Sequence, residues 1–316
     1  ADMLFEEFPK IRLPDGDDKF VDALFQANNL RTQIYESALE QSFRGDVVFR
    51  IRTKDNKIIV EDINPSCFYP KYPFDNVRAE PEYMALEWKV KFDDLGDCLY
   101  VEKHYKGKIV TELYQIKDSK LIKQDLKLKY PDTKEVVNTG INEFMVIHIP
   151  NHRINTMWNG LSDYHDLVDI FKAINNRISR NNVILNKHSD PILAVPQGVI
   201  DDTGSVNRSA FGMIEVRGSG NGQQKDIMPQ YIVWDANLEA AFKEIDILME
   251  VLFMTAEMTP SAFGMDKNGQ AESGRALKFK LLRTIAKKHR KQLYYDHGLR
   301  QLIYVAQLLA QKGYTA

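Results

Sequence analysis

The spacing of apolar residues divides the chain into helical and strand-rich stretches. Over residues 17–42 apolar residues recur three to four positions apart, and Asp17 or Asp18 can cap the start of a helix. The apolar stripe consists of Phe20, Leu24, Ala27, Ile34 and Ala38. This spacing predicts one amphipathic helix that packs on the rest of its domain.

From Gly45 to about Pro150 the pattern alternates in short runs, as is typical of strands. The runs are "DVVFRIR", "KIIVEDI", "YMALEWKVKF", "CLYVEKHY", "KIVTELYQI" and "FMVIHIP". Turn-forming pairs such as Asn64-Pro65 and Lys106-Gly107 separate them. We therefore predict a meander of antiparallel strands with one face open to water.

Helical spacing returns after Gly160 in two long segments. The first spans about 163–187, with Ser162 as N-cap, and the second spans about 235–258. A helix of that length is a rod of roughly 37 Å. The two apolar stripes are Leu167, Phe171, Ile174, Ile178 and Leu185, and then Leu238, Phe242, Ile245, Met249, Leu252 and Ala256.

The stretch 190–234 between the rods is rich in turns and too small for a core of its own. Its strand candidates are "PILAVP", "GMIEVRG" and "MPQYIVW". Rods joined this way run antiparallel, with the small module at one end. Further apolar residues lie off the main stripe of the second rod: Leu248, Val251, Phe253 and Met254. Two interpretations stay open, namely side-by-side packing in an oligomer and burial within a single chain.

A third helix is predicted from Ser273 through the 290s, with Gly298 expected to weaken it. Between Arg275 and Lys291 it carries eight basic residues and no acidic one, which leaves 34 basic against 44 acidic residues, a net charge of −10, elsewhere. Four of the cations share a face: Lys280, Arg283, Lys287 and Arg290. Such a stripe can neutralise phosphates, or it can be solvated or paired with acidic residues of a neighbour.

Composition and charge exclude several classes of protein. The 316 residues are 44% hydrophobic and 27% charged, which is ordinary for about two globular domains and excludes disordered and fibrous chains. The net charge of −2 excludes a protein that is basic all over. No apolar run is long enough for a membrane span, and Cys67 and Cys98 cannot form a disulfide framework, which favours a reducing compartment.

Motifs of catalysis and metal binding are not evident in the sequence. There is no P-loop, so a partner would supply the energy for any movement of DNA, and "RGSGNG" at 217–222 lacks the helix of a phosphate cradle. We interpret His148, His152 and His165 as structural, because no further ligand completes a metal site. We therefore expect no catalytic residue, no metal and no cofactor.

Three segments together resemble the portal (head–tail connector) proteins of tailed double-stranded-DNA bacteriophages. They are "HIPN" from His148, "GLSDYHDLVDIFKAINNRISRNNVILNKHSDPIL" from Gly160, and "FMTAEMTPSAFGMDKNGQAESGRALKFKL" from Phe253. The last contains a Pro and an FG pair before "SG-x-AL" at the head of a helix. Each motif is degenerate alone, and their order and spacing around two long helices is more specific.

The resemblance implies an α+β fold with named parts. It has a β-rich wing domain and long antiparallel stem helices that flank a small αβ clip. The expected parts are the wing at 1–160, the first stem helix at 161–189, the clip at 190–234, the second stem helix at 235–258, the tunnel loop at 259–273, and the long wing helix with a C-terminal helical segment at 274–316. The chain starts with Ala rather than Met. This fits a trimmed chain, in which we expect the N-terminal extension and the C-terminal crown to be short or absent.

The resemblance also implies sites. Candidates to face DNA in the tunnel loop are Met265, Asp266, Lys267, Asn268, Gln270 and Glu272. The basic helix, which would contact DNA or a neighbouring subunit, contributes Arg275, Lys280, Arg283, Lys287 and Arg290. Candidates for partner docking in the clip are Arg208, Arg217, Gln223 and Lys225.

The partners implied are other copies in a ring, usually of twelve subunits, and the double-stranded DNA that passes through it. Further partners are the terminase large subunit, a head–tail adaptor, and a major capsid or scaffolding protein, without a membrane. The expected place is the portal vertex of the virion, after assembly in the host bacterial cytoplasm. The alternatives are another oligomeric virion scaffold protein and an α+β nucleic-acid-processing enzyme with a helical lid.

Overall fold

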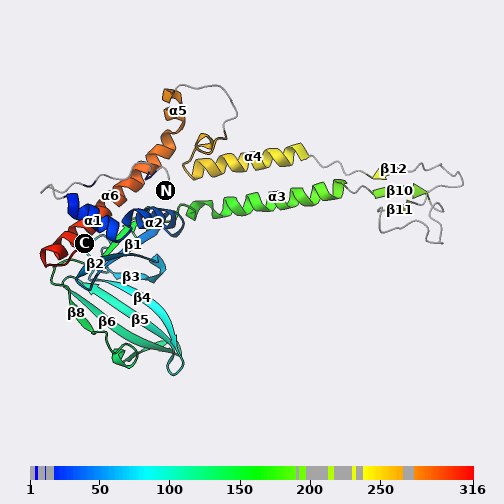
Figure 1. Cartoon of the computed structure of the whole chain (residues 1–316). Coiled ribbons are helices and arrows are strands. Elements are labelled where there is room, and N and C mark those ends of the chain that lie inside the picture. Colours follow the sequence, from blue (N-terminus) through cyan, green and yellow to red (C-terminus); the bar gives the residue numbers. More distant parts are fainter. Residues whose placement is uncertain are drawn as a thin grey trace. The chain divides into compact units, whose positions relative to one another are not determined.

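The structure is a computed structural model that describes residues 4–5, 11, 18–189, 192–196, 213–216, 230–232, 238–265 and 274–316 (Figure 1). It separates into two compact units. The first, here termed the body, comprises Ala1–His165 and Glu257–Ala316, and the second, the hairpin unit, comprises Asp166–Ala256. Both helices and sheets are present, which confirms the predicted α+β class.

Two antiparallel sheets form most of the body. In the smaller sheet, β1 (Asp46–Lys54) lies between β2 (Lys57–Ile63) and β9 (Val146–Pro150). The larger sheet follows chain order through β3 (Phe68–Lys71), β4 (Tyr83–Phe92), β5 (Gly96–Tyr105), β6 (Lys108–Lys117) and β7 (Lys120–Gln124), and β8 (Val136–Asn138) also pairs with β6. All six predicted runs contain strands.

The prediction of a single meander was nevertheless wrong in two respects. The run that contains β9 pairs with β1 instead of extending the larger sheet. Strands β3, β7 and β8 were not predicted, because β3 contains Pro70 and β8 has only three residues, all exposed. In β7, four of the five residues are exposed, so no alternation marks it as a strand.

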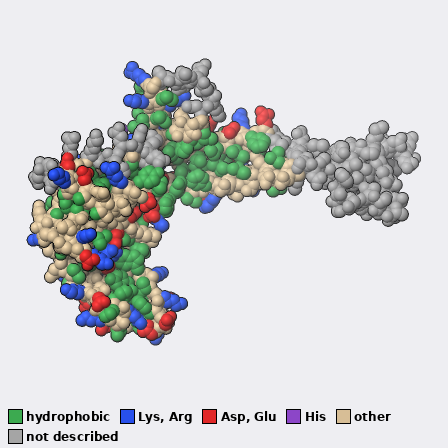
Figure 2. Space-filling view, in the orientation of Figure 1, with side chains coloured by type: hydrophobic (Ala, Val, Ile, Leu, Met, Phe, Trp, Pro, Cys, Tyr) green, Lys and Arg blue, Asp and Glu red, His purple; other side chains and the backbone are tan. Residues whose placement is uncertain are grey.

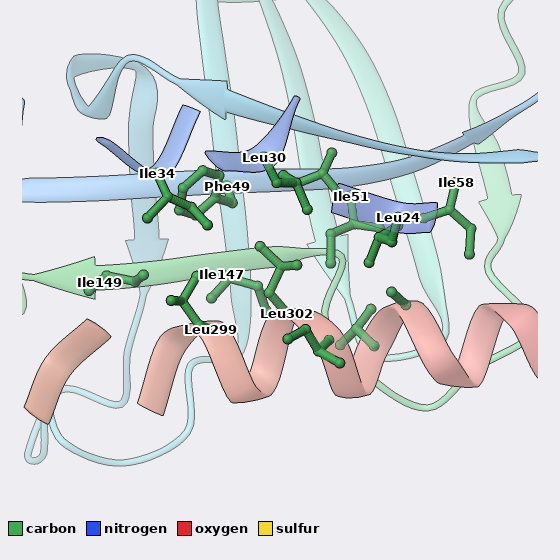
Figure 3. Packing of buried hydrophobic residues seen from close by; sticks show 14 of the residues in the cluster. Leu24, Leu30, Ile34, Phe49, Ile51, Ile58, Ile147, Ile149, Leu299 and Leu302 are labelled. Carbon is green, nitrogen blue, oxygen red and sulfur yellow. The ribbon is translucent and has the colours of Figure 1, made fainter. Parts of the chain in front are cut away.

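Strand β1 carries two hydrophobic cores, one on each of its faces. Phe49 and Ile51 belong to the main core, which they share with helices, whereas Val48 belongs to a second core with Phe68 and Leu86 of the larger sheet. Figure 3 shows the main core, in which side chains of the smaller sheet pack between helices from the N-terminal part of the chain and a helix from the C-terminal part. A strand that is buried on both faces reads as a continuous apolar run, as "VVF" does here.

The helix predicted over 17–42 is two helices, α1 (Asp18–Ala27) and α2 (Leu30–Arg44). Asn29 interrupts them in the left-handed conformation at φ 50°, which Asn tolerates better than most residues. The neighbouring Asn28 uses its side chain to bind β2, since its Nδ2 donates to the Ile58 carbonyl at 3.2 Å and its Oδ1 accepts from the Val60 amide at 2.9 Å. Ala27, placed on the apolar stripe, is exposed.

The third predicted helix is also divided, at Leu281 and not at Gly298. It consists of α5 (Gly274–Lys280) and α6 (Leu282–Gln311), and α6 continues through Gly298, which is buried. Short 3-10 turns occur at η1 (Pro65–Cys67), η2 (Leu126–Leu128), η3 (His165–Leu167) and η4 (Pro260–Phe263).

The hairpin unit contains the two predicted rods, α3 (Val168–Ser189) and α4 (Leu238–Thr255), side by side (Figure 1). Arg177 of α3 and Glu244 of α4 form an ion pair at 2.8 Å. The described parts of the two rods comprise 22 and 18 residues. The three strand candidates between them form one sheet, in which β10 (Ile192–Pro196) pairs in parallel with β11 (Met213–Val216) and antiparallel with β12 (Gln230–Ile232).

Candidate functional site

Helix α4 presents an apolar surface that the hairpin unit does not bury. None of its described side chains, over residues 239–255, is buried. The most exposed apolar side chains are Phe242, Ile247, Val251 and Met254, at 49%, 52%, 36% and 57%. Figure 2 shows hydrophobic side chains gathered along the two rods. A helix with so much apolar surface is typical of one that packs against a further partner.

Helix α3 is apolar on more than one side. Of its predicted stripe, Leu167 and Ile174 are buried, whereas Phe171, Ile178 and Leu185 are exposed. Val183, which lies off that stripe, is also exposed. The two rods therefore share one set of apolar residues with each other and leave a second set at the surface. We term this second set the rod surface; it consists of Phe171, Ile178, Val183, Leu185, Phe242, Ile247, Val251 and Met254.

A second exposed apolar group lies in the body, on α5 and the first half of α6. It consists of Leu277, Phe279, Leu282 and Leu293, which are exposed by 40%, 67%, 60% and 73%. Leu277, Phe279 and Leu282 lie between basic residues of the run, and Leu293 lies two residues after its end. We term this group the helix surface.

The basic run divides into two halves with different surroundings. In the second half, Lys291 Nζ lies 2.7 Å from Asp163 Oδ2, and Lys287 Nζ lies 3.4 Å from Asp163 Oδ1. Arg290 forms an ion pair with Glu257. The acidic partners belong to the same chain, so the predicted stripe of four cations is not one free surface. This half of the run is paired with acidic residues, as one of the alternatives stated. The acidic residues belong to the same chain and not to a neighbour.

Burial makes the pair of Asp163 and Lys291 electrostatically strong. Burial lowers the pKa of Lys291, although the Asp163 carboxylate opposes this. For Asp163, burial raises the pKa, but Lys291, Asn151 and Lys287 outweigh it, so the pKa lies below its ordinary value. Asp163 is therefore ionised at neutral pH, and the pair gains from the low dielectric of its surroundings.

The first half of the basic run is more accessible. Arg275, Lys278 and Arg283 are exposed, and among the described residues none of them has an ion-pair partner. Lys280 is only half-exposed. The first half of the run is therefore accessible to a polyanion, whereas access to the second half is restricted.

Only one of the loop candidates falls within the described residues. Met265 follows the η4 turn and is 55% exposed, after Gly264 in the left-handed conformation at φ 70°. The other loop candidates, Asp266, Lys267, Asn268, Gln270 and Glu272, lie outside the described residues. So do the clip candidates Arg208, Arg217, Gln223 and Lys225.

His148 has a structural partner, as expected. Its Nε2 lies 2.7 Å from Asp46 Oδ1, which also accepts a hydrogen bond from the Gly160 amide at 2.8 Å. Over the described parts of the chain, no group of three or more His, Cys, Asp or Glu side chains is arranged to hold a metal ion. Within the same parts, no helix combines the length and the apolar character that a membrane span needs.

Sequence reasoning missed Asp163 and Glu257 as binding partners of the basic run. Asp163 was noted only for its place in the first turn of a helix, and Glu257 lies within the segment predicted as the end of the second rod. Both are more than 25 residues away in sequence from the cations that they bind, and no local spacing could have revealed them.

The comparison with known families agrees with this architecture. The family model described as "Phage portal protein, SPP1 Gp6-like" matches residues 1–315. A search of curated proteins found no match. The matched family is a structural component of the phage virion that serves in DNA packaging. Because the match extends over nearly the whole chain, the chain belongs to the phage portal protein family.

Proposed function

We propose that copies of this chain form a closed ring around an axial channel, through which double-stranded DNA enters and leaves the phage head. The observation that carries the proposal is the pair of exposed apolar surfaces, the rod surface and the helix surface. A ring of identical subunits needs two different complementary surfaces on each subunit. The rod surface and the helix surface meet that requirement, and the family resemblance favours twelve subunits.

The charge distribution supports passage of DNA without tight binding. Outside the basic run the chain carries a net charge of −10, so most of its surface repels phosphates. A small number of exposed cations then gives brief, salt-sensitive contacts with the DNA backbone. We assign these contacts to Arg275, Lys278 and Arg283, together with the loop at 259–273 that contains Met265.

The partners follow from the same proposal. The terminase large subunit supplies the energy of packaging and docks at the clip, residues 190–234, where a head–tail adaptor later replaces it. The capsid side of the ring contacts a major capsid or scaffolding protein. The ring assembles in the host bacterial cytoplasm and remains at the portal vertex of the virion.

The ring is tested by light scattering and electron microscopy of three proteins. We expect annular particles of many subunits for the wild type and a species near 36.5 kDa for the double variant Ile178→Glu, Ile247→Glu. The matched control is Asn182→Glu, Lys243→Glu, which changes exposed polar residues of the same two helices and should still form rings. A wild-type protein that is monomeric at every concentration would contradict the proposal, as would rings formed by the double variant.

The DNA contacts are tested separately, in rings. We expect Arg275→Ala, Lys278→Ala, Arg283→Ala to assemble normally and to change the amount or the salt dependence of DNA packaged. If packaging by such rings is the same as wild type at every salt concentration, Arg275, Lys278 and Arg283 have no role with DNA. The contacts with DNA would then have to lie elsewhere on the ring, such as the loop at 259–273.

A further inference from the structure

The chain crosses from one unit to the other at two points. Close to each of these points, a residue of the body is bound to the same helix, α6. The passages lie between His165 and Asp166 and between Ala256 and Glu257. Asp163 lies just before the first passage, and Glu257 is the first body residue after the second. Both acids are ion-paired with cations of α6.

The first passage is fixed by a polar cluster. Lys291 Nζ donates to Asp163 Oδ2 at 2.7 Å and to Ser42 Oγ at 2.9 Å. Asn151 Nδ2 donates to Asp163 Oδ1 at 2.9 Å, and the Asp163 amide donates to the Ser42 carbonyl at 2.8 Å. The side chains of Lys291 and Asp163 are only 13% and 20% exposed. This segment is therefore attached to α2, to α6 and to Asn151, the residue that directly follows β9.

The second passage is fixed by fewer contacts. Glu257, in the left-handed conformation at φ 54°, binds Arg290, and the pair is about half exposed. Two residues later the Thr259 amide donates to Thr284 Oγ1 at 3.2 Å, and Thr284 is buried. The left-handed residue ends α4, and the two contacts fix where the chain re-enters the body.

We propose that Thr284, Lys287, Arg290 and Lys291 form a clamp on α6 that positions both connections to the hairpin unit. At 100° per residue these four side chains lie within about a third of the circumference of the helix. The second half of the basic run is thus a mechanical element of the body. Lys287, Arg290 and Lys291 are committed to Asp163 and Glu257 and do not serve as a DNA contact.

The clamp has a consequence for the loop at 259–273. Because one rigid helix holds both connections, they must shift together when either is displaced. Helix α5, which Leu281 separates from α6, follows that loop in the sequence, and the loop starts just after the second connection. A displacement of the hairpin unit by a docked partner would therefore reach the loop through α6. The clamp itself rests only on contacts in the body, and this consequence rests on the proposed function.

Hydrogen exchange tests the clamp with a charge swap at its exposed pair. For the variant Arg290→Glu we expect exchange at 255–262 to become faster by about ten-fold, because the loss of the pair promotes local opening. The double variant Glu257→Arg, Arg290→Glu restores the pair in reverse and should restore slow exchange. Arg283→Glu, which makes the same change of charge two turns earlier on α6, should leave exchange in this segment unchanged.

A second variant addresses the buried connection. Lys291→Met should accelerate exchange at 159–167 while exchange in β1, the reference for an intact fold, stays as in the wild type. If this variant does not fold, the charge swap at Glu257 and Arg290 still decides. The clamp is wrong if Arg290→Glu leaves exchange at 255–262 unchanged, or if the swapped pair does not restore it. Ring formation and packaging are measured separately, so failure of the proposed function would not be mistaken for failure of the clamp.

Discussion

Gly298 of α6 packs directly against Ile149 of β9. A β-carbon built on Gly298 would lie 2.5 Å from Cδ1 of Ile149, well inside normal contact distance. The absence of a side chain therefore lets α6 approach the smaller sheet closely at this point. This explains why a residue that lowers helix propensity lies inside a 30-residue helix without ending it.

We predict that Gly298→Ala destabilises the body by about 1–3 kcal/mol, because overpacking outweighs the gain in helix propensity. The measurement is the free energy of unfolding in urea. Gly274→Ala serves as control, since a β-carbon there would meet nothing within 4 Å. Ile149→Ala, which removes the clashing atoms, should cost less in the Gly298→Ala background than in the wild type. Equal costs would mean that the two residues do not constrain each other.

Asp62 on β2 predicts a dependence of stability on pH. Burial raises its pKa to about 7, assisted by repulsion from Glu40 and Glu36 and opposed by Arg44. In the unfolded chain an Asp titrates near pH 4. Between these values the folded state binds a proton that the unfolded state has lost, so Asp62 makes stability decrease as the pH rises from about 4 to about 7.

The variant Asp62→Asn should remove this contribution. We expect it to raise the melting temperature at pH 8 and to have a much smaller effect at pH 5, where Asp62 of the folded protein is mostly protonated. Asp55→Asn, at an exposed position in the turn after β1, is the control. A gain in melting temperature that is the same at both pH values would argue against titration of Asp62.

Arg50 links the two sheets of the body and should matter more than its neighbour Arg52. Its guanidinium donates to Glu61 of β2 at 2.7 Å and to Glu102 of β5 at 2.9 Å, and its side chain is 18% exposed. Arg52 binds only Glu61 among the described residues and is 40% exposed. We predict a loss of about 1.5–3 kcal/mol for Arg50→Ala and of at most about 1 kcal/mol for Arg52→Ala, measured by urea unfolding. Equal losses would contradict a link between the sheets.

The elements that could be predicted from sequence are those in which periodicity and turn residues agree. The six alternating runs contain strands, and both long helices are present, because each has enough residues for its pattern to stand out. The errors occur where a tertiary contact overrides a local preference. Asn28 binds the edge of β2 and ends a helix whose apolar spacing continues beyond it.

The candidate site could likewise be predicted from the sequence only in part. The exposed apolar residues of α3 and α4 could be recognised, because more apolar positions occur than one helix pair can bury. The roles of the basic residues could not be recognised, because Lys291 and Arg283 have similar local sequences. Only the position of Asp163, brought beside α6 by the fold, separates a buried ion pair from an exposed cation.

The exposure of α4 gives a last prediction, on protection by assembly. In the isolated chain none of its described side chains is buried, whereas α6 buries nine residues, so α4 should exchange its amide hydrogens faster than the second half of α6. When rings form, the rod surface becomes covered and exchange in α4 should slow, while exchange around the buried Leu302 of α6 stays the same. Mass spectrometry of peptides from 238–255 and 299–311, at concentrations below and above assembly, measures both effects. Rings whose α4 exchanges as fast as that of the single chain would show that subunits associate through another surface.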